Sequence, residues 1–202
     1  MKRFFLTVTL LCGVLASSVF AQATDEARLI QVLQSNASPA EKEDACRLLK
    51  QIGTVLCIPT VATLLTDEHL YQSACDVLET LPATEAGHAL LQGLSRATGN
   101  AKAGIIHSLG ERRHRPAVSE LSKLLTASDH LISTSAARAL GRIGGNEATA
   151  TLQKHLPTAA NSLRAAIVDA LLDCAEQLLA DGNRAAALAI YPQFNNTKEN
   201  EH

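Results

Sequence analysis

The sequence predicts an all-α fold, an α-solenoid of about five helical hairpins. Two observations support this: apolar residues recur at helical spacing, and two such series repeat about every 31 residues along the chain. Strand patterns are essentially missing. Hairpins of this size cannot bury an apolar stripe alone, so we expect them to stack into one continuous core with a concave face.

The first helix of each predicted hairpin carries an apolar residue followed four positions later by leucine. Such a pair lies on one face of a helix, so every hairpin offers the same stripe to its neighbour. The pairs begin at Leu29, Val61, Leu90, Leu121 and Leu152.

The second helix carries a fuller stripe at i, i+4, i+7, i+8 and i+11, as in Ile132, Ala136, Ala139, Leu140 and Ile143. This spacing is that of a helix and not of a strand. When the second helices are aligned in this way, the five stripes begin at Glu41, Leu70, Thr98, Ile132 and Leu163.

Glycine, proline and capping residues mark the ends of these helices. Gly53, Gly110 and Gly144 are expected to close second helices in a left-handed conformation, whereas Pro82 must end its helix by another route. The candidate N-cap or turn residues are Asp25, Ser38, Asp67 and Asp129.

Residues 1–23 have the order of a secretory signal peptide. Two basic residues precede a largely apolar stretch from Phe4 to Leu15, and small residues follow at Ala21 and Ala23. Cleavage after either alanine fits this order. We therefore expect an exported protein, periplasmic or secreted after cleavage.

The charge and composition of the remaining chain exclude several classes of partner. Without the two basic residues of the signal peptide, the 18 basic residues fall to 16 against 20 acidic ones, a formal charge of −4. We expect no nucleic-acid partner, because the chain lacks a basic field and has few aromatic residues for stacking. No later segment is apolar over the ~20 residues that a membrane-spanning helix needs.

The cysteines of the mature chain fit either free thiols or a disulfide. Most of them lie inside apolar helical patterns, where buried free thiols are favoured, although an oxidising compartment permits a disulfide. No Cys or His pair has the close spacing typical of a zinc site. The four cysteines are Cys46, Cys57, Cys75 and Cys174.

The segment from Ala136 to Gly144, preceded by Leu124, Leu125 and Asp129, resembles the HEAT repeat of the type shared with phycobilin lyases. The resemblance covers residues 24–175, and outside this unit it lies mainly in the apolar skeleton. The chain is similar in particular to the arrays of secreted bacterial HEAT proteins. This resemblance implies a helical solenoid. The similarity to phycobilin lyases also implies an alternative in which the groove holds a tetrapyrrole.

The C-terminal segment departs from the repeat. Residues 176–194 look like a single tetratricopeptide-type hairpin with a turn at Gly182, and residues 195–202 predict a disordered polar tail. No following repeat covers this end, which would allow self-association. The apolar residues expected to be exposed there are Leu188, Ile190 and Tyr191.

Outward positions of the second helices are predicted to line the concave groove. One row holds Arg47, Asp76, Gly104, Arg138 and Asp169, and the other holds Gln51, Thr80, Ser108, Arg142 and Asp173. Opposite charges in adjacent units predict the lateral ion pairs Arg47–Asp76, Arg138–Asp169 and Arg142–Asp173. These pairs either register the repeats or leave cations such as Arg47 and His107 to hold an acidic peptide. The candidate partner-binding residues are Arg47, Gln51, Asp76, His107, Arg138, Arg142, Asp169 and Asp173.

A second candidate site is the basic connection that contains Arg112, Arg113 and Arg115. It could contact an anionic ligand, a phosphate or a membrane surface. The alternative is a solvated loop whose arginines interact with the carbonyl end of the helix at Leu109.

No pattern in the chain predicts catalysis. Phosphate-binding glycine loops, a nucleophile elbow and paired-carboxylate motifs are missing, and the histidines are scattered. We expect a non-catalytic exported scaffold that binds another protein through its groove and holds no cofactor. The alternative is a tetrapyrrole carrier or lyase-like enzyme.

Overall fold

The computed structural model describes residues 23–159 and 161–192, and this part of the chain consists of helices joined by short connections. The predicted signal peptide up to residue 22 and the predicted tail, 195–202, lie outside the described residues. The predicted all-α solenoid is confirmed, because the described residues contain no strand. No helix within them is long and apolar enough to span a membrane.

The elements alternate between first and second helices of successive units. A helix over residues 23–34 comes first. It is followed by α2 (Pro39–Ile52), α3 (Ile58–Thr63), α4 (Tyr71–Thr80), α5 (Thr84–Leu94), α6 (Gly99–Glu111), α7 (Val118–Leu124), α8 (His130–Ile143), α9 (Gly145–His155), α10 (Asn161–Ala180) and α11 (Arg184–Leu188). Short 3-10 turns extend or precede some first helices at Leu64–Thr66, Arg115–Ala117 and Leu156–Thr158.

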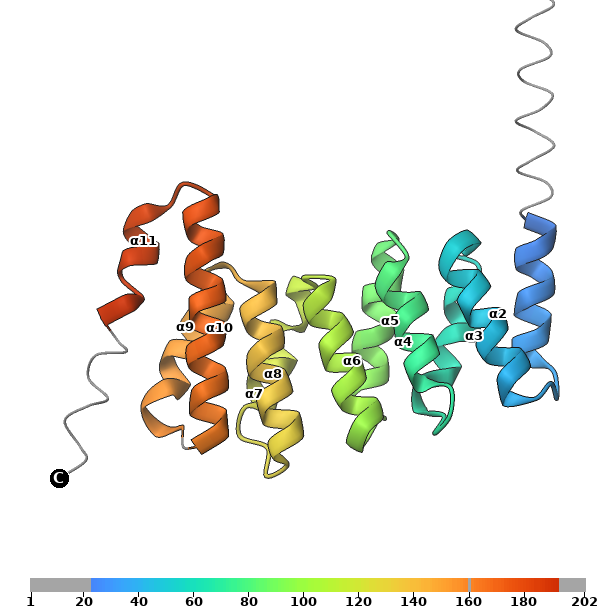
Figure 1. The fold of residues 1–202 in the computed structure, drawn as a ribbon, viewed down its shortest axis with the longest axis horizontal. Coiled ribbons are helices and arrows are strands. Elements are labelled where there is room, and N and C mark those ends of the chain that lie inside the picture. The colour runs from blue at the N-terminus through green and yellow to red at the C-terminus, as the bar shows by residue number, and fades with distance from the viewer. Residues whose placement is uncertain (1–22, 160, 193–202) are drawn as a thin grey trace, which may run out of the picture.

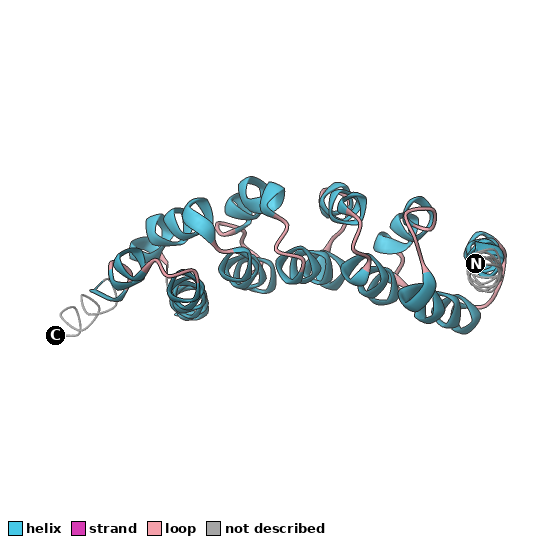
Figure 2. Ribbon diagram, turned by 90° about the horizontal axis from the view of Figure 1, so that it is seen from above, coloured by secondary structure: helices cyan, strands magenta, loops and turns pink. Residues whose placement is uncertain are grey.

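The helices form two rows that curve together (Figure 1). Figure 2 shows the array as a shallow arc, with α2, α4, α6, α8 and α10 on its inner side and the first helices on its outer side. The turns from one unit to the next lie along one edge of the array, and the turns within units lie along the other (Figure 1). The inner row therefore provides the concave face expected of a solenoid.

One continuous core runs between the two rows. Both apolar series contribute to it, with fully buried leucines on outer helices, such as Leu90 and Leu152, and on inner helices, such as Leu78 and Leu140. Removing such side chains from water is the main favourable contribution to folding. No unit could provide this burial alone, so the stacking of units decides the stability.

Several helix ends follow the predicted capping rules. Ser38 forms a capping box with Glu41 at the start of α2, and the side chain of Asp129 accepts hydrogen bonds from the first turn of α8. Gly144 ends α8 with a positive φ of 63°, as expected of it, although its ψ of −160° lies outside the left-handed helical region.

The predicted role of two other glycines was wrong. Gly53 is extended, with a φ of −63°, and Gly110 lies inside α6. Arg113 takes the left-handed conformation after α6, with a φ of 48°, and His114 donates its backbone N–H to the carbonyl of Leu109. This pattern is a Schellman motif completed by a residue other than glycine.

Gly110 and Gly141 instead allow adjacent inner helices to approach closely. A Cβ on Gly110 would lie 2.9 Å from Cα of Ala139, and a Cβ on Gly141 would lie 2.7 Å from Cα of Ala170. The same contact thus recurs between α6 and α8 and between α8 and α10, at an interval of 31 residues. This recurring contact shows which residues of successive units are equivalent.

The predicted register of the third unit was three residues off. With the 31-residue interval, His107 and Glu111 take the two outward positions of α6 that the sequence alignment assigned to Gly104 and Ser108. Ser108 instead faces α4, where its hydroxyl donates to the Glu79 carboxylate at 2.8 Å. The error arose because apolar residues at i+3 and i+4 fit the same helix face equally well.

The predicted boundary between residues 175 and 176 does not divide the structure. α10 runs without interruption from Asn161 to Ala180, so the last solenoid unit and the expected hairpin share one helix. Gly182 makes the turn into α11, with a φ of 78°. Leu188 and Tyr191 are exposed as expected, but Ile190 is 1% exposed, because it packs into the core.

The four described cysteines are free and buried, as the first alternative predicted. Burial raises the pKa of the Cys46 and Cys57 thiols to about 11 and that of Cys75 to about 12. Neutral buried thiols of this kind act as small apolar side chains and are poor nucleophiles.

Candidate binding groove on the concave face

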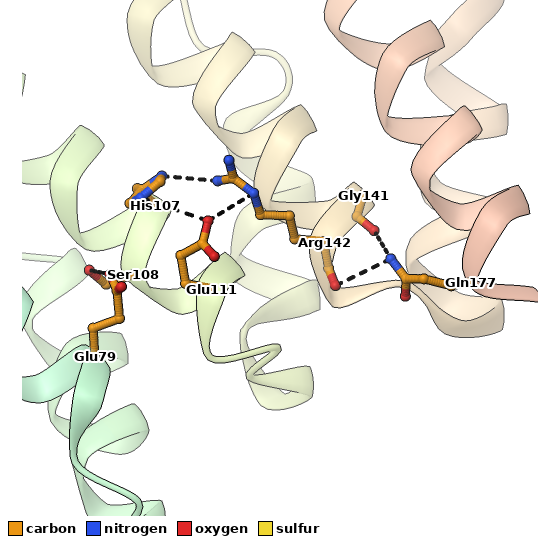
Figure 3. Close-up of polar contacts among 7 residues, drawn as sticks. All are labelled: Glu79, His107, Ser108, Glu111, Gly141, Arg142 and Gln177. Carbon is orange, nitrogen blue, oxygen red and sulfur yellow. Dashed lines mark hydrogen bonds and ion pairs between the residues drawn. The ribbon is translucent and has the colours of Figure 1, made fainter. Parts of the chain in front are cut away.

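Arg142 is the centre of a polar cluster between α6 and α8. Its Nε lies 2.9 Å from Oε1 of Glu111, and its Nη1 lies 2.9 Å from Nδ1 of His107 (Figure 3). The His107 ring also lies 3.8 Å from the Glu111 carboxylate. Two side chains of α6 therefore hold the guanidinium of α8.

The predicted ion pair between Arg142 and Asp173 is not among those of the described residues. The reason is the true register, which places the carboxylate of Glu111 beside Arg142 from the preceding helix. His107, which was expected to be a free cation of the groove, is part of the same cluster. The charge of Arg142 is thus largely satisfied within the protein.

A cleft of about 660 Å³ opens beside this cluster, between the C-terminal halves of α6, α8 and α10. None of its lining residues is aromatic, which does not favour a large planar ligand. The lining residues are Gly110, Glu111, Arg113, Arg142, Asp173, Glu176, Gln177 and Ala180.

The α10 wall of the cleft is acidic. Asp169, Asp173 and Glu176 follow the i, i+4, i+7 spacing of one helix face. Partial burial, then the charge of Glu176 and that of Asp169, raise the pKa of Asp173, against a lowering effect of Arg142. Within the described part of the chain, Asp173 and Glu176 form no side-chain hydrogen bond or ion pair. This wall would accept positive charge.

Gln177 connects the cleft to the end of α8. Its amide nitrogen donates to the carbonyl of Gly141 at 2.9 Å and approaches that of Arg142 at 3.5 Å (Figure 3). The side chain also lies against Gly144, where a Cβ would meet Gln177 Oε1 at 2.1 Å. The last turn of α8 is therefore capped by the next inner helix.

The N-terminal part of the groove is organised differently. Arg47 pairs with Asp44 of its own helix at 2.7 Å, and Asp76 accepts a hydrogen bond from Gln72 at 3.1 Å. The predicted pair Arg47–Asp76 is not formed, although both residues line a cleft of about 360 Å³. Local partners one turn away cost less side-chain entropy than partners in another unit.

The remaining predicted groove residues lie on the inner row without the expected pairing. Arg138 and Asp169 are exposed on α8 and α10, and the described part of the chain contains no ion pair between them. Gln51 is exposed at the end of α2. The lateral ladder of ion pairs predicted from the sequence is therefore wrong, and one junction cluster around Arg142 takes its place.

The basic connection after α6 does not act as one site. Arg112 is only partly exposed, and its guanidinium donates to the carbonyl oxygens of Leu78, Glu79, Leu81 and Ala83. Burial lowers the pKa of Arg112. The arginine thus caps the end of α4, one unit earlier, and not the helix end at Leu109.

This contact also explains how α4 ends before Pro82. Orphan carbonyls at a helix C-terminus attract cationic donors. Arg113 and Arg115 remain exposed, but they line different clefts, with Arg115 on the side of α9 and the α10–α11 turn. The structure therefore separates the three arginines.

The alignment of the second helices with one another did not place Glu111, Glu176 and Gln177 in the groove. Glu111 was detectable in principle, because it lies 31 residues before Arg142, which itself lies 31 before Asp173. Glu176 was assigned to a separate hairpin, so its place on the helix of Asp173 was overlooked. No sequence signal marks Gln177 as a cap for a different helix.

A comparison with protein families agrees with the repeat geometry. Residues 87–172, from α5 into α10, match a family model described as HEAT repeats. The crystal structure of an engineered protein, a Northeast Structural Genomics Consortium target, is similar at 19% identity, with a TM-score of 0.47, and the match covers 87% of this chain and 90% of that chain. No curated protein was found to match. The family match confirms the resemblance stated for Ala136 to Gly144: this part of the chain consists of HEAT repeats.

Proposed function

We propose that this protein is an exported, non-catalytic scaffold that binds a segment of another protein along its concave face. HEAT repeats generally serve as scaffolds for protein interaction. The observation that carries the proposal is the cleft on the concave face, whose α10 wall presents carboxylates that form no hydrogen bond or ion pair with other described residues.

The charges in the cleft favour a basic segment over the acidic one suggested by the sequence. Arg142 is held by Glu111 and His107, so its charge is already partly balanced within the protein. Asp173 and Glu176 face the cleft without partners among the described residues, and their mutual repulsion would be relieved by a lysine or arginine side chain. Complementary charge of this kind sets the preference for a partner more than the total affinity.

The binding test uses fluorescently labelled basic, neutral and acidic peptides of equal length and measures anisotropy with the full chain. The basic peptide should bind most tightly, and added salt should weaken its binding. Replacing Asp173→Asn and Glu176→Gln together should weaken it about tenfold, the equivalent of about 1.4 kcal/mol for two partly exposed charge contacts.

The matched control is Glu85→Gln with Glu120→Gln, which changes the net charge equally on α5 and α7 of the outer row. This control should bind the basic peptide as the wild type does. Equal loss in both double variants would show that only net charge matters, and a preference for the acidic peptide would refute the proposed groove chemistry.

Two further measurements address export and the enzymatic alternative. N-terminal sequencing of protein recovered from the cell envelope should find a start after Ala21 or Ala23. An absorbance spectrum of the protein purified from its native source should show no visible band. A visible band that travels with the protein would support the tetrapyrrole carrier or lyase-like alternative instead.

A further inference from the structure

His114 is buried in the turn between α6 and α7. It is 8% exposed, and its ring packs over Gly87 of α5, where a Cβ would lie 2.4 Å from the ring Nδ1. The ring also meets His88 of α5 edge-on, with 5.3 Å between the ring centroids and an interplanar angle of 76°. The glycine thus provides the space in which the imidazole sits.

The surroundings of His114 disfavour a positive charge on its ring. Its Nε2 is buried and has no hydrogen-bond partner among the described residues. Burial, then His88 from α5 and Arg112 from the same turn, lower the pKa of His114. Arg112 is fixed on the carbonyls at the end of α4, and Glu79 of α4, whose charge acts on Arg112, is hydrogen-bonded to Ser108. The Glu79 carboxylate is therefore already hydrogen-bonded, and Arg112 adds a positive charge near His114.

The same turn forms part of the concave cleft. Arg113 lies between the two anchored residues Arg112 and His114, in a left-handed conformation, and it lines the cleft together with Gly110 and Glu111. A displacement of the His114 ring would therefore move backbone that shapes the cleft. Arg112 and His114 thus hold Arg113 from both sides, and a charge on His114 would lie close to that of Arg112.

We propose that His114 is an acid-sensitive latch, whose protonation releases the turn from Arg112 to Arg115 and reshapes the cleft. This inference concerns the regulation of the cleft and rests on the proposed function. In the closed state of the turn, His114 is neutral and its ring is buried against Gly87. In the open state the ring is exposed and has the ordinary imidazole pKa of about 6.5. The closed state is therefore fully favoured above this value and loses stability as the pH falls below it.

The direct test is hydrogen exchange of the full chain, free of any partner, at pH 7.5, 6.5 and 5.5, with rates corrected for intrinsic exchange. In the wild type, protection of residues 109–118 should fall by up to about tenfold for each pH unit below 6.5, the limit for the linkage of one proton. Protection that stays unchanged down to pH 5.5 would overturn the latch.

Variants separate His114 from other titrating groups. His114→Phe keeps an aromatic ring without a titrating group, and it should abolish the pH dependence of residues 109–118. His130→Gln, which replaces an exposed histidine at the start of α8, should leave it intact. Loss of protection that persists in His114→Phe, or disappears in His130→Gln, would contradict the assignment.

A measurement on the wild type keeps the inference testable if His114→Phe does not fold. The imidazole resonance of His114 should titrate below the ordinary value, and His88→Gln should move that titration upward, because it removes the electrostatic effect of His88 that lowers the His114 pKa. A His114 pKa at or above 6.5 would refute the latch. These experiments contain no peptide, so failure of the proposed function would appear separately, as absent binding at pH 7.5.

Discussion

The junctions between inner helices differ in chemistry along the array. Between α6 and α8, and between α8 and α10, a glycine meets an alanine at close approach. Between α4 and α6, the equivalent positions are Glu79 and Ser108, which are joined by a hydrogen bond of 2.8 Å. The repeat thus preserves the place of the contact while its chemistry changes.

The polar junction needs support that the glycine junctions do not. The Glu79 side chain occupies the position where glycine lets the later helices approach, and Pro82 ends α4 soon afterwards. Arg112, from the following unit, supplies donors to the carbonyls left at that end. We infer that close packing stabilises the later junctions, whereas hydrogen bonds stabilise this one.

The largest expected effect is the loss of the Arg112 cap. Arg112→Ala should lower the free energy of unfolding by about 3 kcal/mol, because several partly buried carbonyls would lose their charged donor. Arg113→Ala, next to it in the exposed turn, should cost less than about 0.5 kcal/mol. Urea denaturation of both variants checks the difference, and similar losses would contradict the structural role of Arg112.

A methyl group should break a glycine junction. Gly141→Ala should lower the free energy of unfolding by about 1–3 kcal/mol, because its Cβ would lie 2.7 Å from the Ala170 backbone. Gly104→Ala is the matched control inside α6, where the nearest atoms lie 3.5 Å or more away. It should raise stability by up to about 1 kcal/mol through helix propensity. Stabilisation by both substitutions would refute the close-packing argument.

A double-mutant cycle sharpens the comparison at the polar junction. Ser108→Ala should cost about 1 kcal/mol, because a partly buried carboxylate loses its donor. In a Glu79→Ala background the same substitution should cost almost nothing, since no acceptor remains. Thermal or urea unfolding of the four proteins measures the coupling, and additive losses would show that the hydrogen bond contributes nothing.

The smallest effect is expected at the backbone of the turn. Arg113→Gly should raise the free energy of unfolding by about 0.5–1 kcal/mol, because glycine adopts a φ of 48° without steric cost. The same substitution at Arg115, outside the left-handed position, should not stabilise the protein. Equal responses at the two arginines would contradict the assigned Schellman motif.

The fold was predictable because its signal is repeated many times. Leu78, Leu140 and the other periodic leucines are buried wherever a unit has neighbours on both sides. Leu48 is 40% exposed, although it belongs to the same pattern, because it lies in the first described unit. Periodicity therefore predicts which face is apolar but not whether a neighbour covers it.

The candidate site was only partly predictable. Arg142 and Asp173 were correctly assigned to the concave row, but their predicted pairing was wrong, because a three-residue slip in α6 hid Glu111. Arg112 looked like part of a basic surface patch, and nothing local indicates that its side chain reaches α4. Long flexible side chains choose their partners in three dimensions.

By itself, the sequence determined the helical class, the length of the repeat and the row of residues that faces the groove, since these follow from short-range periodicity and burial. Tertiary structure alone decided which charges neutralise each other, where glycine is required for packing and how α10 joins the last unit to the C-terminal turn. The physical reason is the distance along the chain over which each kind of interaction acts. Helical periodicity acts over a few residues, whereas the contacts that shape the cleft join side chains about one repeat apart and depend on the register with which the units stack.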